Sequence, residues 1–188
     1  TKTFRMAEDV PLCIPEVNAD HLALLDVQRK KGWTGGVITN ANCAATVACM
    51  ALAPLHERWG VTEVFMATMQ AVSGAGYPGV PSLDILGNVI PYIGDEEPKL
   101  EREMQKMLGK VTGTGIEHAP FVVSAHANRV AVEHGHTTAL SIKLRSKPSV
   151  AEAIEALRSW KGHAVVRGLP SAPEHPLAVT DDPARPQP

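Results

Sequence analysis

Cys43 is the residue whose type and position could most readily do chemistry. It follows Asn42 and directly precedes residues 44–55 (AATVACMALAPL), which are rich in helix-forming residues. A cysteine at a helix N-terminus lies near unpaired backbone N–H groups and the positive end of the helix dipole. Both favour a thiolate, and the N–H groups could hold an oxyanion. The position therefore indicates acyl-transfer or aldehyde chemistry, although a free cysteine is more often an inert buried residue.

The segments on either side of Cys43 predict the elements that would hold it. Residues 36–39 are a short apolar run that predicts a buried strand, and the helix after Cys43 should end near residues 58–60. Residues 61–71 alternate and carry β-branched and aromatic side chains, which predicts a strand, and residues 72–81 form a Gly/Pro-rich loop. A strand, a polar turn and a helix would place Cys43 at a helix N-terminus.

Elsewhere the pattern mixes helices and strands. Periodicity and capping residues predict helices at 19–31, 99–110 and 149–160, the last with Ser149 and Glu152 in a capping box. The same reading predicts strands at 121–132 and 137–144, an edge strand or extended segment at 10–17, and a short last strand at 165–166.

This order favours an α+β fold, because it is not a clean alternation of strands and helices. We expect one domain over residues 1–188, in which helices pack on one face of a mixed, largely antiparallel sheet. An extended lead-in segment is expected at 1–17 and an extended, Pro-rich tail at 170–188. Residues 74–79 (GAGYPG) imitate a dinucleotide-binding Gly-rich turn, but prolines flank them and no helix follows at once, so no such fingerprint is predicted.

Composition narrows the class of protein. The chain has 188 residues, is 44% hydrophobic and carries a formal net charge of -2, which suits one sizeable core and argues against nucleic acid as a partner. Its apolar runs are too short for a membrane span, and its start lacks a signal peptide's apolar core. Three cysteines without metal-ligand spacing indicate a reducing, cytoplasmic compartment and no metal site, with Cys13 and Cys49 in the core.

Two segments together carry a family resemblance. Asn42-Cys43, followed by residues 70–79 (QAVSGAGYPG), closely resembles the catalytic domain of the aspartate-semialdehyde dehydrogenases, in their fungal and archaeal branch. Residues 4–6, 96–99 and 129–136 agree with the same family, so that the resemblance covers essentially the whole chain. It implies a domain like the C-terminal domain of glyceraldehyde-3-phosphate dehydrogenase.

The resemblance also assigns catalytic roles. Cys43 would be the nucleophile that forms a thioester, because a covalently bound acyl group accepts a hydride more readily than an acyl phosphate. His136 would be the general acid and base, with His134 as a bystander, and Gln70 would orient the substrate beside the sulfur. The family often has a hydroxyl residue directly after the cysteine, whereas this chain has Ala44, so Asn42 or Thr46 is expected to cap the helix.

Binding roles follow from the resemblance in the same way. Arg129 would hold the substrate α-carboxylate through its planar fork, and Glu96, rather than Glu97, would meet the substrate ammonium. Substrate contacts are also expected from Asn42, and phosphate contacts from Lys99 and Arg5. Ser73 and Gly74 would approach the nicotinamide of NADP, since small residues let the backbone come close to a planar ring. The family's nucleotide-binding Rossmann domain has no counterpart among these residues, so most of the NADP contacts are expected outside them.

The implied function is the NADP-dependent interconversion of aspartate 4-semialdehyde plus phosphate with aspartyl 4-phosphate. That reaction belongs to the biosynthesis of lysine, threonine, methionine and isoleucine, and the family implies a homodimer. Two alternatives stay open. One is a related acyl-phosphate or malonyl-coenzyme A reductase, and the other is an isolated dimerisation module without activity of its own.

Overall fold

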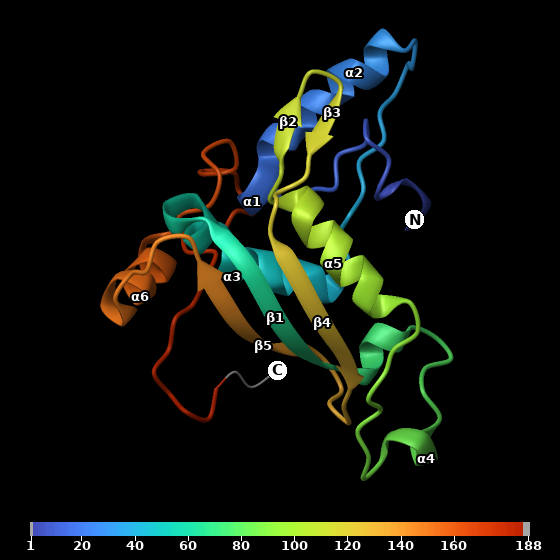
Figure 1. Cartoon of the computed structure of the whole chain (residues 1–188). Coiled ribbons are helices and arrows are strands. Elements are labelled where there is room, and N and C mark those ends of the chain that lie inside the picture. Colours follow the sequence, from blue (N-terminus) through green and yellow to red (C-terminus); the bar gives the residue numbers. More distant parts are fainter. Residues whose placement is uncertain (1, 186–188) are drawn as a thin grey trace.

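The computed structural model describes residues 2–185, and its centre is a three-stranded sheet in the order β4-β1-β5 (Figure 1). The middle strand β1 (Val61–Gln70) runs parallel to β4 (Val122–Arg129) and antiparallel to β5 (His136–Leu144). A separate antiparallel hairpin joins β2 (Lys110–Thr112) to β3 (Gly115–Glu117). The sheet is therefore mixed, and its two outer strands are joined by a connection that passes the end of β1.

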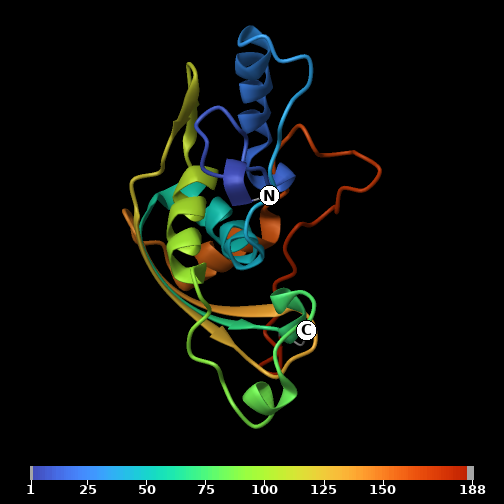
Figure 2. The same cartoon turned by 90° about the vertical axis from the view of Figure 1, so that its right-hand side faces the viewer.

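Helices cover one face of this sheet. Figure 2 shows α3 (Cys43–Trp59) and α5 (Glu96–Met107) on the same side of it, and their apolar side chains pack against the strands. The core includes Ala48 and Leu52 of α3, Leu100 and Met104 of α5, and buried strand residues such as Met66. The opposite face of β1 exposes Phe65, so burial alternates along the strand as a one-sided sheet requires.

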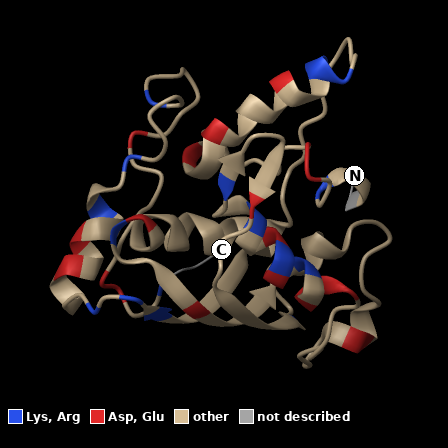
Figure 3. Ribbon diagram, turned by 45° about the horizontal axis from the view of Figure 1, so that its top comes forward, with Lys and Arg blue, Asp and Glu red and all other residues tan. Residues whose placement is uncertain are grey.

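The remaining elements are short and lie around this core. They are η1 (Lys2–Phe4), α1 (Pro15–Asn18), η2 (Ala19–Ala23), α2 (Leu24–Lys30), η3 (Val72–Ala75), α4 (Ser82–Ile85) and α6 (Val150–Ser159). Basic and acidic residues are interspersed over the ribbon in Figure 3, without a large surface of one sign.

Several predicted elements are confirmed. The Cys43 helix begins at Cys43, continues through Pro54 and ends at Trp59, and β1 ends one residue before the predicted limit. In α6, Ser149 accepts the Glu152 N–H and the Glu152 carboxylate accepts the Ser149 N–H, which is the predicted capping box. The α+β class with helices on one sheet face is confirmed as well.

Four local predictions were wrong. Residues 36–39 form no strand, since only Thr39 bridges to Leu12 and Ile38 is half exposed. Residues 165–166 lie in a turn, and the helix predicted at 19–31 is divided into η2 and α2. Residues 10–14 are extended as predicted, before the chain turns into α1 at Pro15. The helix predicted at 99–110 begins at Glu96 instead, which places the first acidic residues on the helix itself. Residues 186–188 of the predicted tail lie outside the described residues.

Candidate active site

One row across the sheet brings three predicted site residues together. Gln70, the last residue of β1, is paired in register with Arg129 at the end of β4 and with His136 at the start of β5. Because β4 is parallel to β1 and β5 is antiparallel, the end of β1 meets the end of one neighbour and the start of the other. The register thus places an amide, a guanidinium and an imidazole side by side.

Cys43 completes this row from the helix layer. His136 Nε2 lies 3.1 Å from Cys43 Sγ, and His136 Nδ1 accepts the backbone N–H of Ala71 at 3.2 Å. An N–H group can only donate, so Nδ1 is unprotonated and a neutral ring carries its proton on Nε2. The imidazole therefore directs an N–H at the sulfur, where it can stabilise a thiolate and donate a proton to an oxyanion formed there.

Asn42 caps the N-terminus of α3; it is one of the two residues, Asn42 and Thr46, that were expected to do so. Its Oδ1 accepts the N–H groups of Ala44 at 2.9 Å and Ala45 at 3.1 Å, and Thr46 Oγ1 donates to the Asn42 carbonyl at 3.0 Å. The cap occupies two of the donors that the sequence offered to an oxyanion. It also ties the position of Cys43 to the position of Asn42.

The acidity of Cys43 differs from the sequence-based expectation. Partial burial raises the pKa of the thiol above its ordinary value, and the negative charge of Glu96 raises it further. The backbone N–H groups of Ala44 and Cys43 and the charge of Arg129 act in the opposite direction, but the net pKa is raised. The backbone N–H groups at the helix N-terminus therefore lower the pKa as expected, but burial and a nearby carboxylate outweigh them, so the thiol is favoured in the free protein.

Glu96 is the acidic centre of the site. It is buried at the start of α5, and its Oε1 accepts the Asn42 amide N–H at 2.6 Å and the Gln70 amide N–H at 3.4 Å. Lys99 Nζ lies 3.6 Å from Glu96 Oε2, one helical turn on. The neighbouring Glu97 turns elsewhere and accepts the Ala127 N–H of β4 at 3.0 Å. Of the two adjacent acids, Glu96 is the one that contacts the residues around Cys43.

Arg129 and His136 are packed against the loop that follows β1. Arg129 is buried, and its Nη1 donates to the Ala71 carbonyl at 2.8 Å, so both polar groups of Ala71 hold residues of the row. A Cβ added at Gly74 would lie 3.0 Å from Arg129 Nη1 and 3.0 Å from His136 Cε1. A side chain at 74 would therefore crowd both Arg129 and His136. Ser73 and Gly74 are both exposed, which leaves this turn accessible beside His136.

The predicted phosphate ligands line a cavity of about 330 Å³ next to the cysteine turn. Its lining residues are Arg5, Met6, Asp95, Pro98, Lys99, Arg102 and Glu103. Arg5 Nη1 donates to Glu103 Oε1 at 3.0 Å, and its Nη2 lies 3.4 Å from the Ala41 carbonyl. The structure thus brings Arg5 and Lys99 to one hollow. A larger cavity of about 740 Å³ lies at the opposite end of α3, around His56, Glu57 and Arg145, away from Cys43.

Glu103 is a site residue that the sequence reasoning missed. It is buried, pairs with Arg5 through one oxygen and accepts the Asn42 N–H through the other at 2.6 Å. The available signal was its spacing, since Glu103 lies two helical turns after Glu96 and so shares a helix face with it. Glu96 and Glu103 thus both hold Asn42, one at its side chain and one at its backbone.

The remaining predictions concern metals and membranes. Among residues 2–185, no group of three or more metal-ligating side chains is arranged to hold an ion. The same part of the chain contains no helix that could cross a bilayer. Of the other cysteines, Cys49 is fully buried as predicted, whereas Cys13 is only partly buried.

Known proteins match the chain over nearly its full length. Residues 52–188 match the family described as semialdehyde dehydrogenase, dimerisation domain. The aspartate-semialdehyde dehydrogenase of Archaeoglobus fulgidus is 50% identical over 98% of this chain and 53% of its own length. A malonyl CoA reductase (NADP) of Metallosphaera sedula is 36% identical over 97% of the chain and 52% of its own length.

A solved structure gives the same picture of the fold. The crystal structure of aspartate semialdehyde dehydrogenase with NADP from Candida albicans superposes with a TM-score of 0.89 and 37% identity. The superposition covers 100% of this chain and 55% of the Candida chain. The chain therefore spans about half the length of the relatives it matches.

Proposed function

The chain belongs to the semialdehyde dehydrogenase family, and from that premise we propose that it forms the catalytic and dimerisation part of an NADP-dependent aspartate-semialdehyde dehydrogenase. The proposed reaction interconverts aspartate 4-semialdehyde plus phosphate with aspartyl 4-phosphate. The observation that carries the proposal is the 3.1 Å contact of His136 Nε2 with Cys43 Sγ, in a row that also holds Arg129. A nucleophile, a proton donor and a carboxylate ligand are the groups that this reaction needs.

The proposed mechanism begins with attack of Cys43 Sγ on the acyl phosphate. The sulfur bonds to the carbonyl carbon, the carbon–oxygen bond to phosphate breaks, and the thiol proton leaves with the phosphate, which gives a thioester. Reduction of the thioester gives a thiohemiacetal oxyanion. His136 Nε2–H, which is directed at the sulfur, shares its proton with that oxygen through a hydrogen bond, which stabilises the negative charge. The proton stays with Nε2 as the carbonyl re-forms and the carbon–sulfur bond breaks, which releases the aldehyde and the cysteine thiolate.

The substrate is oriented by charges at both ends of the site. Arg129 offers a buried guanidinium for the α-carboxylate, and Glu96 offers a buried carboxylate for the ammonium. An ammonium at Glu96 would also offset the charge that raises the pKa of Cys43, so substrate binding itself would favour the thiolate. Arg5 and Lys99 line the adjacent cavity, where the phosphate would lie.

Among the described residues, those near His136 could contact the nicotinamide ring of NADP, and the rest of the cofactor would bind elsewhere. The exposed turn of Ser73 and Gly74 lies against His136, and no side chain at 74 obstructs the approach of a planar ring. When bound, the cofactor supplies the hydride that reduces the thioester. The neighbour from Candida albicans is described as a complex with NADP, which supports the choice of cofactor.

A malonyl-coenzyme A reductase is the alternative within the family, since one relative carries that activity in its name. Glu96 favours the amino-acid substrate, because a malonyl group has no ammonium to pair with a buried carboxylate. The two readings predict different turnover by the intact enzyme. We expect phosphate-dependent NADP reduction with aspartate semialdehyde and no NADPH oxidation with malonyl-coenzyme A. Turnover of malonyl-coenzyme A alone would reverse the assignment.

Cys43→Ser is the variant that tests the nucleophile. In the intact enzyme, the loss of the thiol should lower phosphate-dependent turnover by about 10³-fold or more, because a hydroxyl with a much higher pKa replaces it. Cys13→Ser is a matched control, since Cys13 is not part of the row and is only partly buried. Unchanged activity of Cys43→Ser would refute the assignment.

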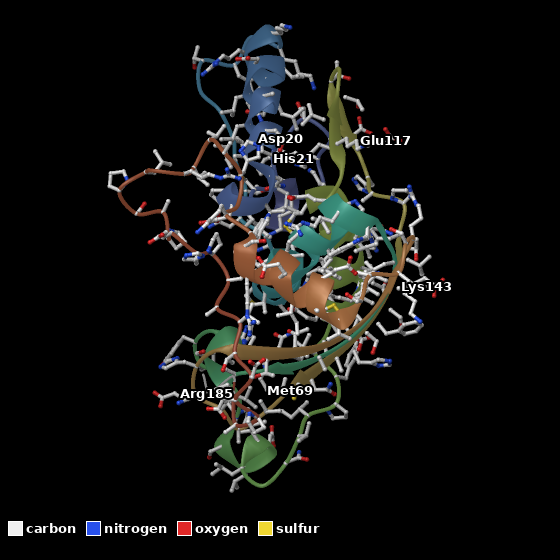
Figure 4. The ribbon with its side chains drawn as sticks, turned by 90° about the vertical axis from the view of Figure 1, so that its left-hand side faces the viewer. Asp20, His21, Met69, Glu117, Lys143 and Arg185 are labelled. Atoms are coloured by element: carbon white, nitrogen blue, oxygen red, sulfur yellow. The ribbon has the colours of Figure 1, made fainter. Side chains whose placement is uncertain are left out.

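We further propose a homodimer that forms on the outer face of the sheet. Phe65 on β1 and Val122 on β4 are 59% and 67% exposed on the face that no helix covers. Lys143, labelled in Figure 4, points away from the helices on the same face and pairs with Glu63 at 2.6 Å. The family's description as a dimerisation domain supports this reading. Light scattering should give the dimer mass, and Phe65→Asp should give a monomer.

A further inference from the structure

Lys106 is a buried lysine that the proposed chemistry does not use. It lies on α5 one turn after Glu103 and is 1% exposed. Its ammonium donates to three backbone carbonyls, those of Arg5 at 2.7 Å, Ala7 at 2.7 Å and Val10 at 2.9 Å. An ammonium has three protons, so all of its donors are taken by the loop at residues 5–10. One side chain therefore binds the loop at three points along its backbone.

Holding a charge in this position is unfavourable in itself. Burial lowers the pKa of Lys106 to about 8, while the charges of Asp9 and Glu103 offset this only in part. Among residues 2–185, no carboxylate forms an ion pair with it; Asp9 pairs with Lys31 and Glu103 pairs with Arg5. A buried ammonium bonded to carbonyls alone adds rigidity to the loop rather than a strong charge pair.

The loop that Lys106 holds connects directly to the cysteine turn. Arg5, whose carbonyl is one of the three acceptors, donates from Nη1 to Glu103 Oε1 at 3.0 Å. The other oxygen of Glu103 accepts the Asn42 N–H at 2.6 Å, and Asn42 caps the helix that begins at Cys43. A continuous set of hydrogen bonds therefore runs from Lys106 through Arg5 and Glu103 to the residue beside the nucleophile.

We propose that Lys106 is a positioning residue for Arg5: by holding the loop at residues 5–10, it fixes the guanidinium in the cavity that Arg5 and Lys99 line, next to the Asn42–Cys43 turn. This inference rests on the proposed function, in which Arg5 binds the phosphate. Lys106 itself does not line that cavity, whereas Arg5 does. Its influence on phosphate must therefore pass through the placement of Arg5.

Lys106→Met in the intact enzyme tests this, with Lys110→Met as the matched control at an exposed position near the same helix end. Methionine keeps the length of the side chain but donates no hydrogen bond. We expect the KM for phosphate to rise about tenfold, while kcat at saturating phosphate stays within about twofold. Lys106→Arg should recover part of the loss, because its guanidinium can still donate to the carbonyls. An unchanged KM for phosphate in Lys106→Met would overturn the proposal.

A double-mutant cycle with Arg5→Ala separates positioning from general stability. If Lys106 acts through Arg5, Lys106→Met should change the KM for phosphate by less than about twofold in the Arg5→Ala background. If Lys106 contributed only to the stability of the fold, the effects of the two substitutions on the KM for phosphate would be independent and would multiply. Multiplying effects would therefore also overturn the proposal.

Amide hydrogen exchange makes the result independent of turnover. Lys106→Met should speed exchange in residues 5–10 and at residues 42–45, whereas Lys110→Met should leave both segments unchanged. If the wild type shows no phosphate-dependent turnover, the proposed function is wrong. In that case, amide hydrogen exchange alone tests whether Lys106 positions the loop and the cysteine turn. Faster exchange at both segments then supports the coupling from Lys106 to the cysteine turn, and exchange unchanged at 42–45 refutes it.

Discussion

His136 Nε2 lies 3.1 Å from Cys43 Sγ, although the two residues are 93 positions apart in sequence. The contact joins the first residue of β5 to the first residue of α3. It is fixed from the far side of the ring, where the Ala71 N–H donates to Nδ1. The backbone of the loop after β1 thus decides which ring nitrogen faces the sulfur.

His136→Gln removes that proton donor but keeps a polar side chain. We expect kcat for phosphate-dependent NADP reduction to fall by about 10²- to 10⁴-fold, the range for loss of a general acid and base. His134→Gln is the control, because His134 is exposed and its Nε2 lies 3.3 Å from Glu133 Oε1, outside the row. Steady-state kinetics on both variants decide the matter. If His136→Gln kept more than a tenth of the wild-type kcat, the proposed role would be wrong.

The individual elements around this contact could be predicted because their signals are local. The alternation of residues 61–71 and the capping residues Ser149 and Glu152 each determine their own segment. The row of Gln70, Arg129 and His136 could not be derived in this way. It depends on β1 lying between β4 and β5 and on the parallel register with β4, neither of which leaves a local pattern. Only the family resemblance grouped these residues beforehand.

The failed strand at residues 36–39 has a specific cause. Gln28 on α2 accepts the Val37 N–H at 2.8 Å and donates to the Val37 carbonyl at 3.0 Å. One side chain therefore satisfies the backbone groups that a neighbouring strand would have paired with. A side-chain amide from a separate helix is invisible to a pattern read along the segment itself.

Glu96→Gln should make Cys43 more reactive in the absence of substrate. The charge of Glu96 raises the pKa of the thiol, so its removal should lower that pKa and increase the thiolate fraction near neutral pH. The pH profile of alkylation by iodoacetamide measures this directly and should move to lower pH. Glu101→Gln removes an acid of the same helix that is not among the charges shifting the pKa of Cys43, and its profile should match the wild type. A profile that moves to higher pH in Glu96→Gln would contradict the electrostatic account.

Gly74→Ala tests the close packing of the loop after β1. The new Cβ would lie 3.0 Å from both Arg129 Nη1 and His136 Cε1, so at least one of these side chains must shift. We expect kcat/KM for aspartate semialdehyde to fall by about tenfold or more, since small displacements of positioned groups lower rates strongly. At Gly113 an added Cβ would meet nothing within 4 Å, and Gly113→Ala should keep wild-type kinetics. Equal kinetics in the two variants would show that the loop yields freely.

Lys106 gives the stability of the protein a dependence on alkaline pH with a definite sign. Burial lowers its pKa from 10.5 to about 8 in the folded state, so between about pH 8 and 10.5 the unfolded chain binds more protons than the folded one. The penalty for the buried charge is fully present below about pH 8 and is relieved as the pH rises towards 10.5. The charges of Asp9 and Glu103, which raise the pKa, are already included in this net direction.

The difference in unfolding free energy between wild type and Lys106→Met isolates this effect, because the other titrating groups are common to both. That difference should be flat below about pH 8 and should then move in favour of the wild type, by up to about 3 kcal/mol at pH 10.5. Urea denaturation at a series of pH values measures it. Lys110→Met, which removes an exposed lysine, should show no such rise relative to wild type. A difference that moves against the wild type above pH 8 would mean that the folded state holds this proton more tightly than the unfolded chain does.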